Sequence, residues 1–266
     1  MTDTTNHTAK PPADNGGMPG NIWPVRSAVA IAHAISTCRK SGQMGLVTGP
    51  SGTGKTTAAR AMVAALDEEG IDACLVMMTR AADGLQPGLL RIAKAVGAYV
   101  QPNMGGADIY DAVVHHIATQ WGRASVLVLD EAQFMSEALI DALRNLSDEV
   151  RGDGLLRGVV MIGTPDLAAR IEGKLGGRSR HFEPLRGRLY LDNLDGLGAS
   201  DFDAIASGLG VAGTQAVQLL AKVATGRGGL HNVARVVQSA KRLAGSGQPL
   251  SLGTLRIAMQ GLGVGA

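Results

Sequence analysis

The sequence predicts an α/β protein in which helices flank a parallel central sheet, followed by a small all-helical domain. Two observations support this fold class. Between residues 22 and 195, short apolar runs of strand length alternate with longer amphipathic segments, which is typical of βαβ crossovers. After Leu194 only helical periodicities remain, and glycines interrupt them.

Five runs are predicted as strands because they are short and rich in branched apolar residues. The run SVLVLD at 125–130 has a continuous apolar centre, so we expect this strand to be covered on both faces. Gly45 weakens the first run without excluding it as a strand. In chain order, the predicted strands are 44–47, 73–78, 125–130, 158–163 and 188–194.

Helices are predicted where apolar residues recur three or four positions apart. After Ser27, the residues Val29, Ala32 and Ile35 have this spacing, and another helix is expected over about 55–65. Two helical stretches follow the second strand. The clearest stripes are Ile109, Val113 and Ile117 within 107–120; Leu139, Ile140, Leu143 and Leu146 within 136–146; and Leu230, Val233, Val237, Ala240 and Ala244 in the C-terminal domain.

The composition predicts three segments in a cytoplasmic protein. Residues 1–21 are polar and nearly lack large apolar side chains, so we expect a disordered tail, then a core domain at 22–195 and a helical domain at 196–266. The two cysteines are isolated, which argues against a disulfide scaffold or a CxxC site. The longest apolar stretch, 28–35, is too short for a membrane span. The net charge of +2 neither requires nor excludes an acidic partner.

A glycine-rich loop at 49–57, GPSGTGKTT, fits the phosphate-binding pattern GxxxxGK[ST], with a predicted strand before it and a predicted helix after it. Glycines let successive backbone N–H groups face an anion, and the helix adds its positive N-terminal end. Lys55 is expected to reach the β and γ phosphates, and Thr56 to offer its hydroxyl to Mg²⁺. The expected nucleotide contacts are Gly49, Pro50, Ser51, Gly52, Thr53, Gly54, Lys55, Thr56 and Thr57.

Asp130 and Glu131 follow the apolar residues VLVL at the carboxyl end of a predicted strand, where open α/β sheets bind ligands. An aspartate at this point holds Mg²⁺ in P-loop enzymes, and the neighbouring glutamate can deprotonate the water that attacks the γ-phosphate. An acid after a strand is often only a helix cap, so the pair alone is a weak indication of a catalytic site. Together with the phosphate loop it becomes a strong one. We expect Asp130 to be a metal ligand and Glu131 the catalytic base.

The acidic pair also separates classes of nucleotide-binding protein. GTPases need an NKxD-type motif and ABC ATPases an LSGGQ-type signature, and neither string is present. A DExH helicase pairs two such domains in a longer chain. Small-molecule kinases share the loop but need no glutamate beside the aspartate, so the pair favours hydrolysis over transfer and leaves a kinase as a minor alternative.

Thr164 directly follows the predicted strand 158–163 and lies level with the acidic pair if that strand adjoins 125–130. In that position its side chain can contact the γ-phosphate. An ordinary turn is an equal alternative, because Thr-Pro-Asp is favourable turn chemistry.

Four arginines, Arg178, Arg180, Arg186 and Arg188, lie close together in the chain. One of them can act as an arginine finger, which reaches the nucleotide of a neighbouring subunit and stabilises the transition-state charge. For any single arginine, a solvated basic surface is the commoner outcome.

Together these motifs resemble those of the AAA+ ATPases. GPSGTGKTT resembles Walker A, VLVLDEAQ resembles Walker B, Thr164 is similar to sensor 1, and the C-terminal helices resemble the lid. Within this class, DEAQ, MIGTPDL and LRGRLYLDNL are similar to the group that contains the phage Mu B protein, the TniB and TnsC transposition regulators and the ExeA-type ATPases. The resemblance covers roughly residues 22–262.

The resemblance implies an ATPase that uses ATP and Mg²⁺, assembles with its own copies into rings or filaments on DNA, and stimulates a partner transposase. Such a protein is cytoplasmic and encoded by a phage or mobile element, with no membrane partner. Lys55 and Thr56 then bind phosphate and Mg²⁺, Asp130 holds the metal, and Glu131 is the base. Arg186 or Arg188 is the implied finger.

The sequence departs from the resemblance in two places. The Mu B protein has an N-terminal DNA-binding helical domain, where this sequence has its polar tail. Many AAA+ lids start a helix with GxxR, whereas this sequence reads GGLH, with His231 at the arginine position and Arg235 one turn later. Either residue can act as sensor 2, and His231 can equally be a plain helix-start residue.

DNA contacts need only lysine or arginine near phosphates. Arg80, Arg91 and Lys94 lie after the second strand, in a segment that can face the channel of a ring, and Arg151 and Arg157 flank another loop. Ordinary surface charge is at least as frequent an outcome for each.

Two alternatives to transposition stay open. One is an ExeA-type ATPase of secretion or envelope machinery, which a peptidoglycan-binding extension would favour, and none is visible. The other is a nucleotide-gated signalling or adaptor switch whose slow hydrolysis only times a protein interaction.

Overall fold

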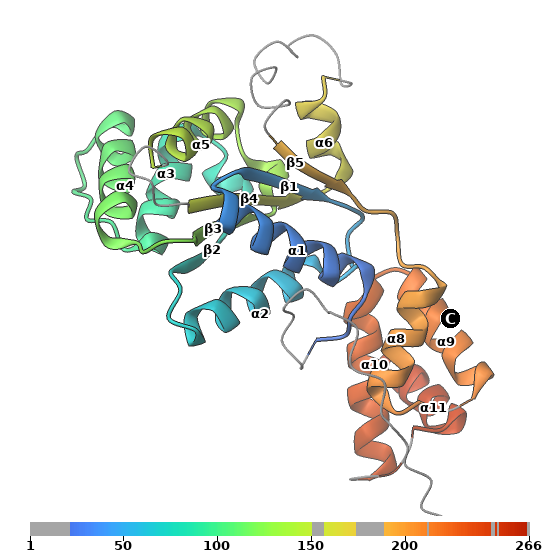
Figure 1. The fold of residues 1–266 in the computed structure, drawn as a ribbon. Helices are drawn as coiled ribbons and strands as arrows, with labels where there is room; N and C mark the ends of the chain where they lie inside the picture. Colours follow the sequence, from blue (N-terminus) through green and yellow to red (C-terminus); the bar gives the residue numbers. More distant parts are fainter. Residues whose placement is uncertain are drawn as a thin grey trace, which may run out of the picture.

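The chain forms one parallel sheet with helices on both faces and a separate group of C-terminal helices to one side (Figure 1). The computed structural model describes residues 22–150, 157–173, 189–211, 213–245, 248 and 250–264, so the predicted tail 1–21 lies outside the described residues. The strands are β1 (Met44–Thr48), β2 (Ala73–Met77), β3 (Ser125–Asp130), β4 (Arg157–Gly163) and β5 (Leu189–Asn193). Their order is β2-β3-β4-β1-β5, which confirms the predicted fold class.

The strand order brings three loops together at one edge of the sheet. β4 lies between β1 and β3, with Thr48 paired to Gly163 and Leu129 paired to Met161. All neighbouring strands are parallel, so the loops after β1, β3 and β4 leave the same edge. Open α/β sheets bind their ligands at this edge.

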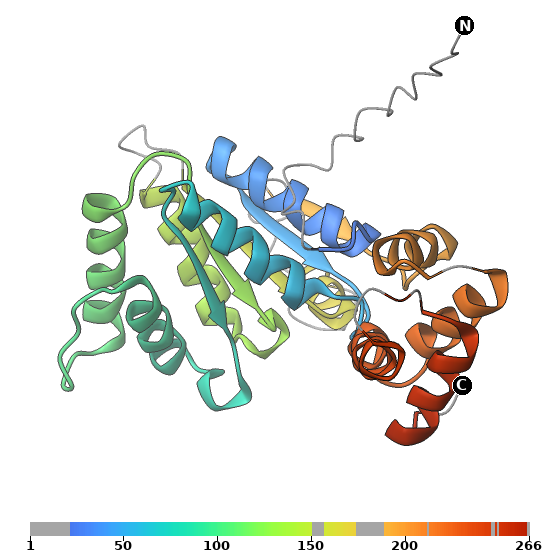
Figure 2. The same cartoon turned by 90° about the horizontal axis from the view of Figure 1, so that it is seen from below.

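Helices cover both faces of the sheet. α1 (Arg26–Ser41) and α2 (Lys55–Glu68) lie side by side on one face (Figure 2). The opposite face is covered by α3 (Leu85–Val96), α5 (Glu137–Glu149) and α6 (Pro165–Ile171), and α4 (Gly106–Gln120) packs against α3 and α5. Two short 3-10 turns, η1 (Arg80–Ala82) and η2 (Ala132–Phe134), follow β2 and β3.

The core confirms the predicted burial of β3 on both faces. Val126 and Val128 pack towards α1 and α2, whereas Leu127 and Leu129 pack towards the opposite helices. Each such fully buried side chain stabilises the fold by about 1.5–3 kcal/mol. The predicted stripes are buried in α4 (Ile109, Val113, Ile117), in α5 (Leu139, Ile140, Leu143, Leu146) and in α10 (Leu230, Val233, Val237, Ala240), while Ala244 is half-buried.

The helix predicted after Ser27 is present as α1, with Ala32 and Ile35 buried, but Val29 is 37% exposed. The buried face of this helix runs through Ala28, Ile31, Ile35 and Cys38, which also satisfies helical spacing. Small residues allow this face to lie directly on the sheet: a Cβ built on Gly158 would come within 2.5 Å of the Cys38 carbonyl carbon. The close approach to the backbone of β4 fixes the rotation of α1 and leaves Val29 outside.

The C-terminal helices are α8 (Ala199–Leu209), α9 (Thr214–Thr225), α10 (Gly229–Ala244) and α11 (Leu252–Leu262). Their apolar faces share one buried cluster with α1 and α2, so these helices also pack against the sheet domain. Within the described ranges, no helix has both the length and the apolarity needed to cross a lipid bilayer.

Arg157, which we considered as a DNA contact, is instead a buried structural residue. It is 2% exposed, and its guanidinium donates to the carbonyls of Val150 (3.0 Å), Ala118 (3.1 Å) and Trp121 (2.9 Å). These carbonyls lie at the C-terminal ends of α4 and α5, where backbone oxygens need donors and a positive charge is favourable. Because the side chain is enclosed, it has no surface to offer to a phosphate.

We expect Arg157→Met to lower the free energy of unfolding by about 2–4 kcal/mol, because it leaves buried carbonyls without donors. Urea unfolding followed by circular dichroism measures the change. Arg123→Met is the matched control, since Arg123 is exposed. Equal stability of the two variants would show that Arg157 does not hold the helix ends.

Candidate active site

The loop between β1 and α2 has a backbone suited to surround an anion. The Gly49 N–H donates to the Gly163 carbonyl (3.1 Å), which ties the loop to the end of β4. Gly52 and Gly54 have φ of +81° and +92°, in the left-handed region that favours glycine. Gly54 directly precedes α2 and has no side chain to cap it, so the N-terminal N–H groups of the helix remain available to an anion.

The side chain of Lys55 lies across this loop. Its Nζ donates to the carbonyls of Gly49 (2.8 Å) and Pro50 (2.7 Å). Burial lowers the pKa of Lys55 below its usual value, while the carboxylates of Asp130 and Glu131 act in the opposite direction. The ammonium group of Lys55 therefore lies between the loop backbone and two acids. A polyphosphate bound there can replace the two carbonyls as the hydrogen-bond acceptor of Nζ.

The acidic pair ends β3 and begins η2. Asp130 is buried, and its Oδ1 accepts a hydrogen bond from the Glu131 N–H (2.9 Å). Glu131 has φ +56°, a left-handed conformation that costs a residue other than glycine about 1–3 kcal/mol and is found most often at functional sites.

Two buried oxygens beside the loop, Asp130 Oδ2 and Thr164 Oγ1, have no hydrogen-bond partner among the described residues. A buried polar atom without a partner is costly, so both are suited to a ligand. Asp130 and Thr164 line the same cavity as Thr56. Because Mg²⁺ prefers oxygen ligands such as a carboxylate, and a P-loop threonine hydroxyl also binds it, Thr56 and Asp130 fit the predicted metal.

These groups line one cavity of about 410 Å³, within the usual size range of small-ligand pockets. Its lining includes the loop and strand-end residues Ser51, Gly52, Gly54, Lys55, Thr56, Thr57, Asp130, Glu131 and Thr164. Thr53 supports the loop instead, since it is buried and its hydroxyl donates to the Pro50 carbonyl (3.1 Å). The lining also includes apolar residues that the sequence did not predict as part of the site: Ile22, Trp23, Val25, Ala28, Leu230 and Ala234. A lining with both polar and apolar residues suits a nucleotide, which has charged phosphates and a flat base.

The N-terminus of α10 rests directly on the phosphate loop. The Leu230 N–H donates to the Gly52 carbonyl (2.8 Å). Gly229 has φ +54°, and a Cβ built on it would lie 2.4 Å from the Gly52 oxygen. Only glycine fits here, so the pair Gly228-Gly229 brings the C-terminal helices into contact with the loop backbone.

We expect Gly229→Ala to separate α10 from the loop while the sheet domain stays folded, because the added Cβ would overlap the Gly52 oxygen. Hydrogen exchange measured by mass spectrometry should then be faster at the Leu230 amide. Gly261→Ala is the matched control, since this glycine lies in α11 with open space around it and without a positive φ. Unchanged protection of Leu230 would contradict the predicted contact.

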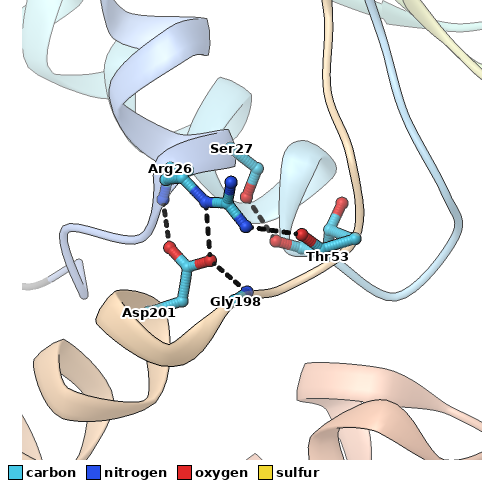
Figure 3. Close-up of polar contacts among 6 residues, drawn as sticks. Arg26, Ser27, Thr53, Gly198 and Asp201 are labelled. Atoms are coloured by element: carbon cyan, nitrogen blue, oxygen red, sulfur yellow. Dashed lines mark hydrogen bonds and ion pairs between the residues drawn. The ribbon is translucent and has the colours of Figure 1, made fainter.

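A second set of contacts joins the loop, α1 and α8 (Figure 3). Asp201, 1% exposed, accepts hydrogen bonds from the Arg26 N–H (2.6 Å), Arg26 Nε (3.1 Å) and the Gly198 N–H (2.8 Å). The next residue in the chain, Ser27, donates to the Thr53 carbonyl (2.5 Å). The start of α1 is thus bonded on one side to the C-terminal helices and on the other to the phosphate loop.

Among the described residues, the candidate DNA contacts do not line this cavity. Arg80, Arg91 and Lys94 are exposed on η1 and α3. Of the two sensor 2 candidates, among the described residues His231 lines the cavity and Arg235 does not. The remaining arginines of interest lie outside the described residues: Arg151, Arg178, Arg180, Arg186 and Arg188.

Sequence reasoning missed one polar residue of the cavity, Gln133. Its Nε2 donates to Glu131 Oε2 (2.5 Å), and its Oε1 accepts from the Thr164 N–H (3.3 Å). The signal was present in the motif DEAQ, where an amide side chain follows the acid by two positions. Its meaning depends on β4 lying beside β3, which the sequence pattern does not specify.

Comparison with known proteins agrees with this geometry. A family model described as "AAA domain" matches residues 38–171. General secretion pathway protein A of Aeromonas hydrophila is 29% identical over 150 residues, which are 53% of this chain and 26% of the relative. The chain therefore spans about a quarter of that protein's length.

Solved structures with a similar fold include three with identities of 15–18%. The ORC2 protein of Aeropyrum pernix, in ADPNP and ADP complexes, has a TM-score of 0.62 and aligns with 88% of this chain and 65% of its own. ORC1 of the same organism, in complex with DNA, has a TM-score of 0.59, covering 89% of this chain and 64% of ORC1. Cdc6p of Pyrobaculum aerophilum has a TM-score of 0.59, covering 96% and 65%. At these identities the likeness concerns the fold.

Proposed function

We propose that this chain, which belongs to the AAA domain family of P-loop ATPases, hydrolyses ATP with Mg²⁺ in this cavity. We assign residues 22–195 to the ATPase core and 196–266 to its lid. The observation that carries the proposal is the convergence of Lys55, Asp130, Glu131 and Thr164 on one cavity at the end of the parallel sheet.

In the proposed reaction, Lys55 and the N-terminus of α2 bind the β and γ phosphates. Thr56 and Asp130 hold Mg²⁺, which when bound would neutralise phosphate charge. Glu131 accepts a proton from water as the water oxygen bonds to the γ-phosphorus, and the bond from that phosphorus to the β–γ bridging oxygen breaks, which yields ADP and phosphate. Thr164 directs its hydroxyl to the γ-phosphate. Arg186 or Arg188 of a neighbouring copy serves as the finger.

We further propose that the protein assembles with ATP on DNA, without sequence preference, and regulates transposition by selecting target sites and activating a transposase. The motifs DEAQ, MIGTPDL and LRGRLYLDNL support this reading through their similarity to the Mu B, TniB and TnsC group. Exposed Arg80, Arg91 and Lys94 offer charges to DNA phosphates. The ORC1 structure with DNA supports the idea that this fold can carry DNA binding.

Co-sedimentation with duplex DNA of mixed sequence, followed by electron microscopy, tests the assembly. We expect rings or filaments on DNA with a non-hydrolysable ATP analogue and none with ADP. Replacing Arg80, Arg91 and Lys94 together by alanine should weaken DNA binding while ATP affinity is retained. A failure of the wild-type protein to form nucleotide-dependent assemblies on DNA would exclude the transposition function.

A second candidate function is that of an ATPase in secretion machinery. The similarity to general secretion pathway protein A favours it, although that protein is much longer than this chain. The same sedimentation experiment discriminates between the candidates. Assembly driven by ATP in the absence of DNA, with no binding to added duplex, would favour the secretion candidate.

A further inference from the structure

Gln133 connects the proposed base to the residue that follows the neighbouring strand. Its side chain lies between Glu131 and Thr164, with contacts of 2.5 Å to Glu131 Oε2 and 3.3 Å to the Thr164 nitrogen. It crosses from η2, after β3, to the end of β4. Both ends of this bridge are in the lining of the nucleotide cavity, as is Gln133 itself.

The neighbours determine which way the Gln133 amide points. The Thr164 N–H can only donate, so it requires the amide oxygen, and the Glu131 carboxylate can only accept, so it requires the amide NH₂. Each partner therefore enforces the orientation that the other needs. The side chain lies across Gly163, where a Cβ would come within 3.0 Å of Gln133 Oε1, so the absence of a side chain at this position leaves room for the bridge.

The backbone that carries Gln133 is also held. Arg170 donates from Nη1 to the Gln133 carbonyl (3.3 Å) and from Nη2 to the Met135 carbonyl (2.9 Å). Arg170 comes from α6, which begins directly after Thr164. Two side chains thus hold η2 to the segment that bears Thr164. Gln133 extends from η2 to the Thr164 N–H, and Arg170 extends from α6 to the backbone of η2.

The consequence concerns the two oxygens of Glu131. A general base needs a carboxylate oxygen that faces the attacking water at hydrogen-bond distance. Gln133 holds Oε2, which leaves Oε1 to meet that water and restricts rotation of the carboxyl group. Since the same amide is bonded to Thr164, the positions of Glu131 and Thr164 are linked through one side chain.

We propose that Gln133 is a positioning residue for ATP hydrolysis, which orients the Glu131 carboxylate through its amide NH₂ and couples that carboxylate to Thr164. The proposal rests on the proposed role of Glu131 as the base. It concerns turnover and leaves nucleotide binding unaffected, because Gln133 touches the base rather than the phosphate loop.

Two substitutions separate the positioning role from a merely structural one. Gln133→Glu keeps an acceptor for the Thr164 N–H but sets a second carboxylate against Glu131 in place of the amide donor, whereas Gln133→Met has a similar length and loses both hydrogen bonds. In the full chain we expect each variant to lower kcat by about 10- to 100-fold, the size of effect caused by a misplaced reacting group. For Gln133→Met, KM for ATP and Kd for a non-hydrolysable ATP analogue should stay within about twofold, whereas the added negative charge of Gln133→Glu should also weaken binding of ATP. Thermal unfolding should confirm that both variants are folded.

Measuring Glu131→Gln together with the two Gln133 variants distinguishes a failure of the positioning role from a failure of the base assignment. If Gln133→Glu retains the wild-type kcat while Gln133→Met loses it, the residue serves only to satisfy Thr164, and the positioning role is overturned. If Glu131→Gln abolishes turnover and both Gln133 variants keep it, the positioning proposal alone fails. If Glu131→Gln itself keeps turnover, Glu131 is not the base, and the positioning role of Gln133 is rejected as well. In the expected case, Gln133→Met has no additional effect on turnover in the Glu131→Gln background.

Discussion

Glu131→Gln is expected to lower kcat for ATP hydrolysis by about 10²- to 10⁴-fold, the usual contribution of a general base. The amide keeps the size of the side chain but cannot accept the proton of the attacking water. ATP affinity should change little, because the phosphates are bound by the loop and Lys55. Phosphate release at saturating ATP measures the first quantity, and titration with a fluorescent ATP analogue measures the second.

The control for this substitution is Glu137→Gln, which removes a carboxylate at the first position of α5, outside the lining of the cavity. It should hydrolyse ATP at the wild-type rate. The Glu131→Gln protein should also retain ATP and accumulate as nucleotide-bound oligomers. Normal turnover by this variant would mean that another group deprotonates the water.

Lys55→Ala is expected to weaken binding of ATP by about 10- to 100-fold, because each charge-assisted hydrogen bond in a buried site contributes about 1.5–3 kcal/mol. The effect should be greater for ATP than for AMP, since AMP lacks the β and γ phosphates that Lys55 is proposed to bind. Isothermal titration calorimetry with both nucleotides gives the two affinities.

Removal of a partly buried cation can also alter the loop itself, so Lys55→Met provides a second variant that keeps the length of the side chain. Lys40→Ala, at an exposed position in the last turn of α1, controls for the loss of one positive charge. ATP affinity equal to that of the wild type in both Lys55 variants would contradict the assignment of this cavity to the phosphates.

Local sequence was sufficient for the parts of the site that lie within one loop. The phosphate loop and the acidic pair were predictable because their chemistry depends on residues a few positions apart, between a strand and a helix. The fold class followed from the alternation of apolar runs for the same reason. The order of the strands did not follow, and this order is what places Thr164 between Lys55 and Glu131 and gives Gln133 its two partners.

Long-range packing explains the errors and omissions. Arg157 was considered a DNA contact because it flanks a loop, but the ends of α4 and α5 meet around it and supply three carbonyl acceptors. Val29 has the right spacing for a buried stripe, yet the contact of Cys38 with Gly158 sets a different rotation of α1. The bonds of Asp201 to Arg26 join segments far apart in the chain, so no local pattern indicates them.

We propose that this cavity hydrolyses ATP in a cycle coupled to DNA. Steady-state phosphate release by the purified wild-type protein, with and without mixed-sequence duplex DNA at saturating ATP and Mg²⁺, measures this coupling. We predict turnover that duplex DNA stimulates and that Glu131→Gln lowers by about 10²- to 10⁴-fold under both conditions. A turnover rate that is the same with and without DNA would rule out the coupling and would favour a nucleotide-gated switch or a secretion ATPase.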